Sequence, residues 1–118
     1  MILDTFKSIL ESIELKSDVY FGMGPKKPVK YDYIVFNRLK SHYSKDLSSI
    51  TDYFEVTILR EDFIPDDLDS QIIKALTEGI SGLKLSATDT EYMYWKKPNT
   101  DVNVEFMRIL FYKARKRC

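Results

Sequence analysis

The sequence predicts an α+β fold in which two helices are packed on a mostly antiparallel sheet of four or more strands. Residues 53–59 alternate apolar and polar side chains with the period of two that is typical of a half-buried strand. Residues 2–13 and 68–76 repeat apolar side chains at the spacing of an amphipathic helix. Residues 91–97 and 102–114 predict two further strands, because the turn-forming residues between them are typical of a hairpin.

The first part of the chain predicts one helix, two strands and a loop. Residues 2–13 carry a single lysine, Lys7, on the polar side, so we expect this helix to pack on its own sheet and not on a membrane surface. Residues 19–21 predict a short strand, and residues 30–38 alternate like a longer one. Residues 40–49 are polar and predict a long hairpin loop.

The middle of the chain predicts a strand followed by a helix. Pro65 ends the strand region, and Asp66 and Asp67 place negative charge where a helix begins. Gly79 and Gly82 predict the end of that helix. One apolar face of each element is expected to share a single core, formed by Phe54, Val56, Ile58, Leu68, Ile72 and Leu76.

The last predicted strand is apolar on both faces. Residues 83–86 predict a short strand and residues 87–90 a turn before the final hairpin. Within residues 102–114, Met107, Ile109 and Phe111 share one face and other apolar residues line the opposite face. Burial on both faces predicts either a central strand or an edge strand that another subunit covers.

Length and charge limit the class of protein. A chain of 118 residues is enough for one domain, which we expect to span residues 1–118. Eighteen basic and 18 acidic residues give no net charge, which argues against binding to nucleic acid or membranes through bulk charge and favours self-association. No stretch of 18 apolar residues is present, so no membrane partner is expected.

The residues that could support catalysis lack the partners that such chemistry needs. His42 is the single histidine and Cys118 the single cysteine, so neither a catalytic triad nor a zinc site is expected. Residues 22–28 begin Gly-x-Gly but contain two prolines and lack the third glycine of a dinucleotide loop. A nuclease pattern would need its Glu-x-Lys after Pro65, whereas residues 14–16 supply it upstream. We therefore predict no enzyme, no metal and no cofactor.

A basic run near the C-terminus leaves one alternative open. It could contact nucleic acid phosphates or an acidic partner, or it could be a solvated tail that follows the last strand. The run consists of Lys113, Arg115, Lys116 and Arg117.

Three stretches of the sequence resemble one known protein family. They read YDYIVFNRLK, TDYFEVTILREDFIPDDL and LKLSATDTEYMYWKKPNTDVNVEFMRILFYKARKR, and they extend from residue 31 to residue 117. The most recognisable parts are residues 33–38, 54–65 and 97–105. They resemble tail terminator proteins, also called tail completion or head–tail joining proteins, of long-tailed, non-contractile phages and prophages of Gram-positive bacteria.

The resemblance implies a protein that works by assembly. It implies a two-helix α+β fold, a ring of six copies that caps the tail tube, and a second ring face that meets the head-side connector. DNA would pass through the ring without sequence-specific contact, and the protein would be part of the virion at the head–tail junction after assembly in the host cytoplasm. Loops 40–49 and 22–28 are then candidates for the assembly contacts, together with the last strand. The candidate interface residues are His42, Tyr43, Lys45, Met107, Ile109 and Phe111. A small nucleic-acid-binding module and another minor head–tail or capsid protein remain alternatives.

Overall fold

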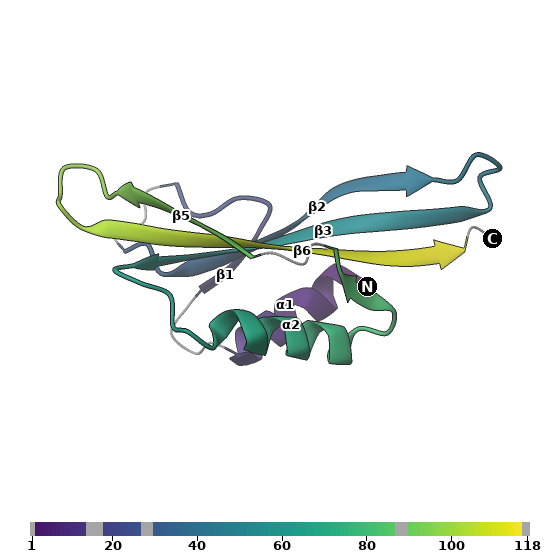
Figure 1. Cartoon of the computed structure of the whole chain (residues 1–118), viewed down its shortest axis with the longest axis horizontal. Helices are drawn as coiled ribbons and strands as arrows, with labels where there is room; N and C mark the ends of the chain where they lie inside the picture. The colour runs from purple at the N-terminus through teal and green to yellow at the C-terminus, as the bar shows by residue number, and fades with distance from the viewer. Residues whose placement is uncertain (1, 14–17, 27–29, 87–89, 117–118) are drawn as a thin grey trace.

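The computed structural model describes residues 2–13, 18–26, 30–86 and 90–116. A six-stranded sheet forms the centre of the molecule in the order β1-β2-β3-β6-β4, and β5 also pairs with β6 (Figure 1). The elements in chain order are α1 (Ile2–Ile13), β1 (Asp18–Phe21), β2 (Tyr33–Tyr43), β3 (Ser49–Glu61), α2 (Leu68–Gly79), β4 (Leu83–Leu85), β5 (Glu91–Lys96) and β6 (Asn103–Lys116). The turn expected at residues 87–90 and the pattern at residues 14–16 lie largely or wholly outside the described residues.

The predicted fold class is wrong. Strands hold 49% of the described residues and helices 23%, so the protein is largely β. The sheet is mixed, because β1 runs parallel to β2 while the other pairs are antiparallel. Three strands of 11, 13 and 14 residues dominate it and continue beyond the helices, which cover only part of one face (Figure 1).

Strand β6 is a central strand. It pairs with β3 on one side and with β4 and β5 on the other. This position explains why its sequence is apolar on both faces, and it confirms the central-strand alternative. The alternative, an edge strand covered by another subunit, is therefore not required to explain the apolar residues on both faces.

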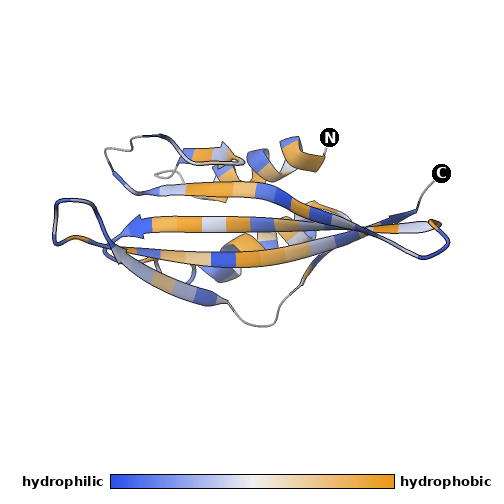
Figure 2. Cartoon of the chain, turned by 90° about the horizontal axis from the view of Figure 1, so that it is seen from above, coloured by the Kyte–Doolittle hydropathy of each residue, from blue (hydrophilic) through white to orange (hydrophobic). Residues whose placement is uncertain are grey.

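Half of the polar segment 40–49, which was expected to be a loop, is strand. β2 continues to Tyr43, and its pairing with β3 extends from Tyr33↔Leu59 to Tyr43↔Ile50 with a bulge between Arg38 and Lys40. The sequence did not predict this extension, because a strand with both faces exposed can consist of polar residues and then resembles a loop. Figure 2 shows that β2 changes from mostly hydrophobic residues (orange) to mostly hydrophilic residues (blue) along its length.

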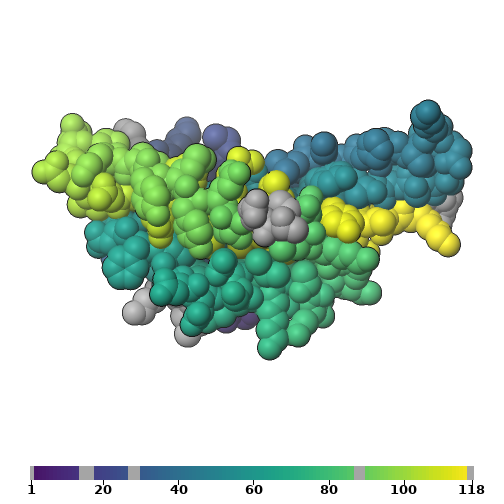
Figure 3. All heavy atoms as spheres, viewed as in Figure 1, coloured from purple at the N-terminus to yellow at the C-terminus, as the bar shows by residue number. Residues whose placement is uncertain are grey.

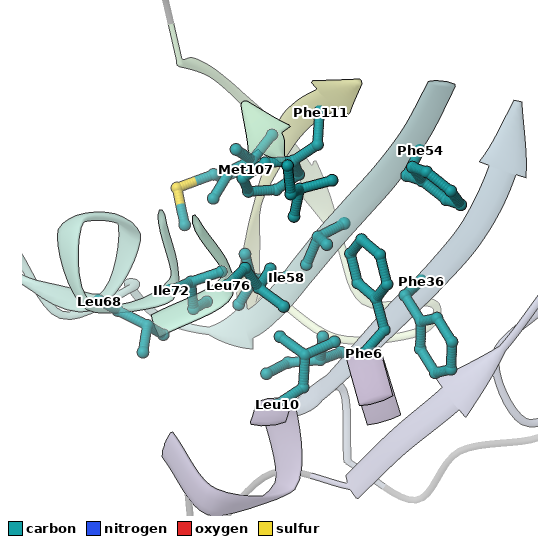
Figure 4. Packing of buried hydrophobic residues seen from close by; sticks show 14 of the residues in the cluster. Phe6, Leu10, Phe36, Phe54, Ile58, Leu68, Ile72, Leu76, Met107 and Phe111 are labelled. Atoms are coloured by element: carbon teal, nitrogen blue, oxygen red, sulfur yellow. The ribbon is translucent and has the colours of Figure 1, made fainter. Parts of the chain in front are cut away.

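The core lies between the helices and one face of the sheet. The six residues predicted to share a core are all in one buried cluster, which confirms that prediction (Figure 4). α1 contributes Leu3, Phe6 and Leu10. The Phe6 ring lies 5.0 Å from the ring of Phe54 and 6.4 Å from that of Phe111, measured between centroids.

The two helices begin and end close to the predicted positions and contact each other. Asp67 is the N-cap of α2 but makes no side-chain capping bond, so its contribution is its charge at the helix start. Near the other end, a β-carbon at Gly79 would lie 2.6 Å from Ile9 Cδ1 of α1. Glycine at this position therefore allows α1 and α2 to approach closely.

The molecule is elongated, with extents of 52 × 26 × 25 Å. The far parts of β2, β3 and β6 project at one end, and the β5–β6 hairpin projects at the other (Figures 1 and 3). Among the described residues, no helix is long and apolar enough to cross a bilayer. The two projecting ends are the parts of the protein that the helices leave uncovered.

Candidate assembly surfaces

The first projecting end is a three-stranded arm, defined here as residues 38–52 and 112–116. His42 and Tyr43 are the last two residues of β2, and Lys45 lies in the tip that joins β2 to β3. All three are exposed. These three predicted interface residues therefore lie together on an accessible surface. The basic residues 113, 115 and 116 are part of β6 and not a tail after it, which corrects that expectation; Arg117 and Cys118 lie outside the described residues.

The other three predicted interface residues do not lie on a surface. Met107, Ile109 and Phe111 are 0–2% exposed and belong to the core cluster. They alternate onto the sheet face that the helices cover, so the protein's own core already buries them. Their side chains offer no surface to another subunit, although the assembly interface itself stays a prediction.

Hydrogen bonds fix the tip of the arm. Asp46 Oδ1 accepts bonds from Ser44 Oγ at 2.7 Å, Ser48 Oγ at 2.8 Å and Ser48 N–H at 3.1 Å. The hydroxyls of Ser44 and Ser48 and the Ser48 amide lower the pKa of Asp46 from 3.8 to about 2. Leu47 takes a left-handed φ of 59° within this turn, so the tip has a defined shape.

The arm carries an excess of positive charge. Its six cations outnumber its two carboxylates, Asp46 and Asp52; the cations are Arg38, Lys40, Lys45, Lys113, Arg115 and Lys116. Burial raises the pKa of Asp52, but hydrogen bonds from Arg115 Nε at 2.7 Å and Ser41 Oγ at 2.6 Å outweigh this effect and leave the pKa below its usual value. Because the whole chain has no net charge, the rest of the molecule is correspondingly acidic.

A cleft of about 290 Å³ lies beside the arm on the helix side of the sheet. Its apolar wall is formed by Ile2 and Phe54. Its polar wall is formed by Arg38, Ser41, Asp52, Lys113 and Arg115. Arg115 is bound to Asp52, whereas the side chains of Arg38 and Lys113 make no hydrogen bond or ion pair with the described residues, although the charge of Arg38 contributes to lowering the pKa of Asp52. The cleft thus combines apolar surface with two cations that are available to an acidic ligand.

The opposite end presents a hairpin and an acidic loop. The outer strand β5 exposes Tyr92, Met93 and Tyr94 at 43, 42 and 65%. Residues 62–67, which we call the acidic loop, connect β3 to α2 at this end (Figure 1). Phe63 in this loop is 72% exposed.

A buried carboxylate holds the acidic loop and the hairpin together. Glu105 of β6 is 8% exposed, and its Oε1 accepts a bond from Ile64 N–H at 2.6 Å. Its Oε2 accepts a bond from the Tyr94 hydroxyl at 2.6 Å, which raises the pKa of Tyr94. Because one side chain bonds to both segments, their backbones have a fixed relative position.

Aromatic rings cross the sheet face opposite the helices near the same end. Tyr20 contacts Tyr33, Tyr33 contacts Tyr31, and Tyr31 contacts Trp95 with ring centroids 4.9 Å apart. Burial, together with the phenols of Tyr31 and Tyr20, raises the pKa of Tyr33. All three ring contacts are edge-to-face or tilted, so the rings pack against one another and stabilise the sheet.

A larger cavity of about 650 Å³ lies where β1 and β2 begin and β3 ends. Its lining includes charges of both signs that bind one another or the backbone. Lys30 Nζ lies 3.1 Å from Asp32, and Glu61 accepts a bond from Tyr31 N–H at 2.6 Å. These contacts tie the loop before β2 to the end of β3, which is a structural role.

The described residues contain no group of three or more metal-ligating side chains. His42 lies alone on the arm, far from the buried Glu105. The prediction that the protein is not an enzyme stays a prediction.

The sequence did not predict the residues that form the cleft or the exposed apolar side chains. Leu39, Phe63 and Met93 are apolar and exposed; Met93 lies between two tyrosines, whereas Leu39 and Phe63 lie beside charged residues in the sequence. That neighbourhood is a weak signal of exposure. The cleft has no local signal, because its walls come from three strands and α1.

No family model matches this chain, and no curated protein matches it. Among solved structures, it is similar to a chain in the virion of a native gene transfer agent particle. The TM-score is 0.47 and the sequence identity 11%, over 98% of this chain and 92% of that chain.

Proposed function

We propose that this protein is a structural component of a phage-like virion that assembles head-to-tail with copies of itself. The proposal has its origin in the resemblance of residues 31–117 to tail terminator proteins. The observation that carries it in the structure is the distribution of exposed apolar side chains. Most of the large exposed apolar residues lie at the two ends of the molecule, and the two ends are different.

The arm exposes Leu39, Tyr43 and Leu47 at 47, 51 and 49%. The opposite end exposes Phe63 and the residues of β5. Exposed apolar clusters on soluble proteins mark surfaces that bind other molecules. Two different surfaces that bind each other produce a heterologous contact, which closes into a ring when the rotation between subunits permits.

The finer assignment is a tail terminator. In this proposal the chain acts as one domain, six copies form the ring, and one ring face binds the last layer of the tail tube. The other face meets the head-side connector, and DNA passes through the centre without sequence-specific contact. The protein acts by shape and surface complementarity, without catalysis, at the head–tail junction of the virion.

Single lysine substitutions at each end test the head-to-tail contact. Leu39→Lys and Met93→Lys place a charge on one end each, and each variant alone should remain monomeric in sedimentation velocity runs where the unchanged chain associates. An equal mixture should form dimers and no larger species, because one intact end remains on each variant. Lys74→Glu on the exposed side of α2 is the matched control and should associate like the unchanged chain. Higher oligomers in the mixture would contradict a head-to-tail contact.

The excess of cations on the arm supports a second candidate, a nucleic-acid-binding module. Such binding would be sequence-independent and would weaken steeply with salt. Fluorescence anisotropy with a labelled DNA duplex over a salt series tests it. A steep salt dependence that Lys40→Ala and Lys116→Ala reduce would favour this candidate, and absence of binding at low salt would exclude it.

A further inference from the structure

The cleft beside the arm has the chemistry of a socket for an acidic segment with an apolar side chain. Its walls are Ile2 and Phe54 on the apolar side and Arg38 and Lys113 on the charged side. Arg115 neutralises Asp52 at 2.7 Å, so the remaining charge of the cleft is positive. A ligand that places an apolar group and carboxylates together would satisfy both walls.

The acidic loop has the complementary features. Phe63 is 72% exposed, and the carboxylates of Asp62, Asp66 and Asp67 are exposed beside it. The loop is not free to withdraw Phe63, because Ile64 is buried and its N–H bonds to Glu105 at 2.6 Å. An exposed aromatic ring on a fixed backbone is the usual form of an anchor residue at an interface.

The loop and the cleft of the same molecule are too far apart to meet. Asp52 in the cleft and Asp62 in the loop lie at opposite ends of β3, ten residues apart in the sequence. A strand of that length spans about 33 Å. A contact between these surfaces therefore joins two copies of the chain.

We propose that the acidic loop of one copy seats in the cleft of the next. The ring of Phe63 packs against the partly buried Ile2, and the carboxylates of Asp66 and Asp67 face Arg38 and Lys113. This inference rests on the proposed self-assembly and names the residues that make the contact. Because cleft and loop are different surfaces at opposite ends, the contact is heterologous and repeats from copy to copy.

A duplex nucleic acid is the rival occupant of the cleft. The cleft fits it less well, because a phosphate backbone gains nothing from contact with the apolar wall of Ile2 and Phe54 and is repelled by the Asp52 carboxylate. An acidic peptide segment with an aromatic side chain uses both walls.

Charge exchange between the two surfaces tests the proposal. The cleft-reversed chain carries Arg38→Glu and Lys113→Glu, and the loop-reversed chain carries Asp66→Lys and Asp67→Lys. Each should weaken self-association by at least about tenfold in sedimentation velocity, since like charges then face each other. The chain with all four substitutions should regain association, because opposite charges face each other again. Phe63→Ala should weaken association about thirtyfold, as for loss of an interface anchor.

Two controls keep the outcomes distinct. Lys74→Glu changes an exposed residue of α2 that belongs neither to the cleft lining nor to the acidic loop, and it should leave association unchanged. Thermal melts of every variant verify folding, and duplex binding is measured for the cleft-reversed chain. If the Phe63→Ala and cleft-reversed chains associate normally, the proposed contact is wrong, while the proposed function still stands. The same conclusion follows if the cleft-reversed chain loses only its binding to the duplex. An unchanged chain that never associates, alone or with tail tubes, overturns both.

Discussion

Ile72 is fully buried, on the face of α2 that packs in the core cluster with Ile58 and Met107 (Figure 4). Ile72→Ala removes buried methylene groups and leaves a cavity, so we expect a loss of about 2–5 kcal/mol in the free energy of unfolding. Urea denaturation measures it. The neighbouring Ile73 is only partly buried, and Ile73→Ala should cost clearly less. Equal losses for the two variants would show that the buried face of α2 is assigned incorrectly.

Glu105 is the one buried charged residue described, and both of its oxygens accept a hydrogen bond. Glu105→Gln keeps the shape but replaces one accepting oxygen with an amide that donates. We expect a loss of about 1–3 kcal/mol in the free energy of unfolding, because hydrogen bonds to a neutral amide are weaker than those to a carboxylate. The pKa of Tyr94 should also fall toward 10.0, since its hydrogen bond to the Glu105 carboxylate raises it.

Urea denaturation and carbon-13 NMR of the tyrosine rings provide the two readouts. Glu91→Gln, at an exposed position on β5, is the control. A Glu105→Gln chain that keeps both its stability and the Tyr94 pKa would refute the role of this carboxylate.

At the scale of elements, the tip of the arm depends on an ionised Asp46. Its pKa is about 2 in the folded chain against an ordinary value of 3.8. A lowered folded pKa means that the contribution to stability is present above the ordinary pKa and is lost as the pH falls through about 2. NMR titration should show this midpoint for Asp46 and an upward shift toward 3.8 in Ser44→Ala. A midpoint near 3.8 in the unchanged chain would show that the tip is not closed by these bonds.

The helices could be predicted from the sequence because their signals are local. Apolar spacing over residues 2–13 and the Pro65, Asp66 and Asp67 cluster gave both helices and their starts. The arm could not be predicted, because residues 40–43 are polar on both strand faces and look like a loop until their pairing with β3 is known. The parallel pairing of β1 with β2 has no local signal either, and it is the reason why the sheet is mixed.

The candidate interface could be predicted only in part, for a related reason. Alternation showed that Met107, Ile109 and Phe111 share a face of the last strand, but alternation cannot tell which face the helices cover. The polar positions His42, Tyr43 and Lys45 were found because exposed charge and turn residues have a direct sequence signal. The cleft required the folded arrangement of β2, β3, β6 and α1.

At the scale of the whole molecule, charge is distributed unevenly although its sum is zero. The arm is basic and the opposite end carries the acidic loop. The proposed head-to-tail contact joins these ends. We therefore expect association to weaken as salt screens the attraction, over a range where the Debye length falls from about 30 Å at 0.01 M to about 10 Å at 0.1 M. Light scattering at a fixed protein concentration measures it. Association that strengthens with salt would indicate an apolar contact without a charge component.

We expect divalent metal ions to contribute neither to the stability of the protein nor to its assembly. If the protein acts by assembly alone, removing divalent metal ions should change neither the melting temperature nor the oligomeric state. Differential scanning calorimetry before and after treatment with a chelator checks this. A clear drop in the melting temperature would reveal a bound ion and contradict the proposal that none is needed.

The proposed function requires copies of this chain to join end to end into a ring on a tail tube. Cryo-electron microscopy of purified tail tubes incubated with the protein tests it most directly. We expect a closed ring of the protein at one end of each tube, in which the arm of every copy contacts the acidic loop of its neighbour. Bare tube ends, with the protein monomeric in solution, would contradict it.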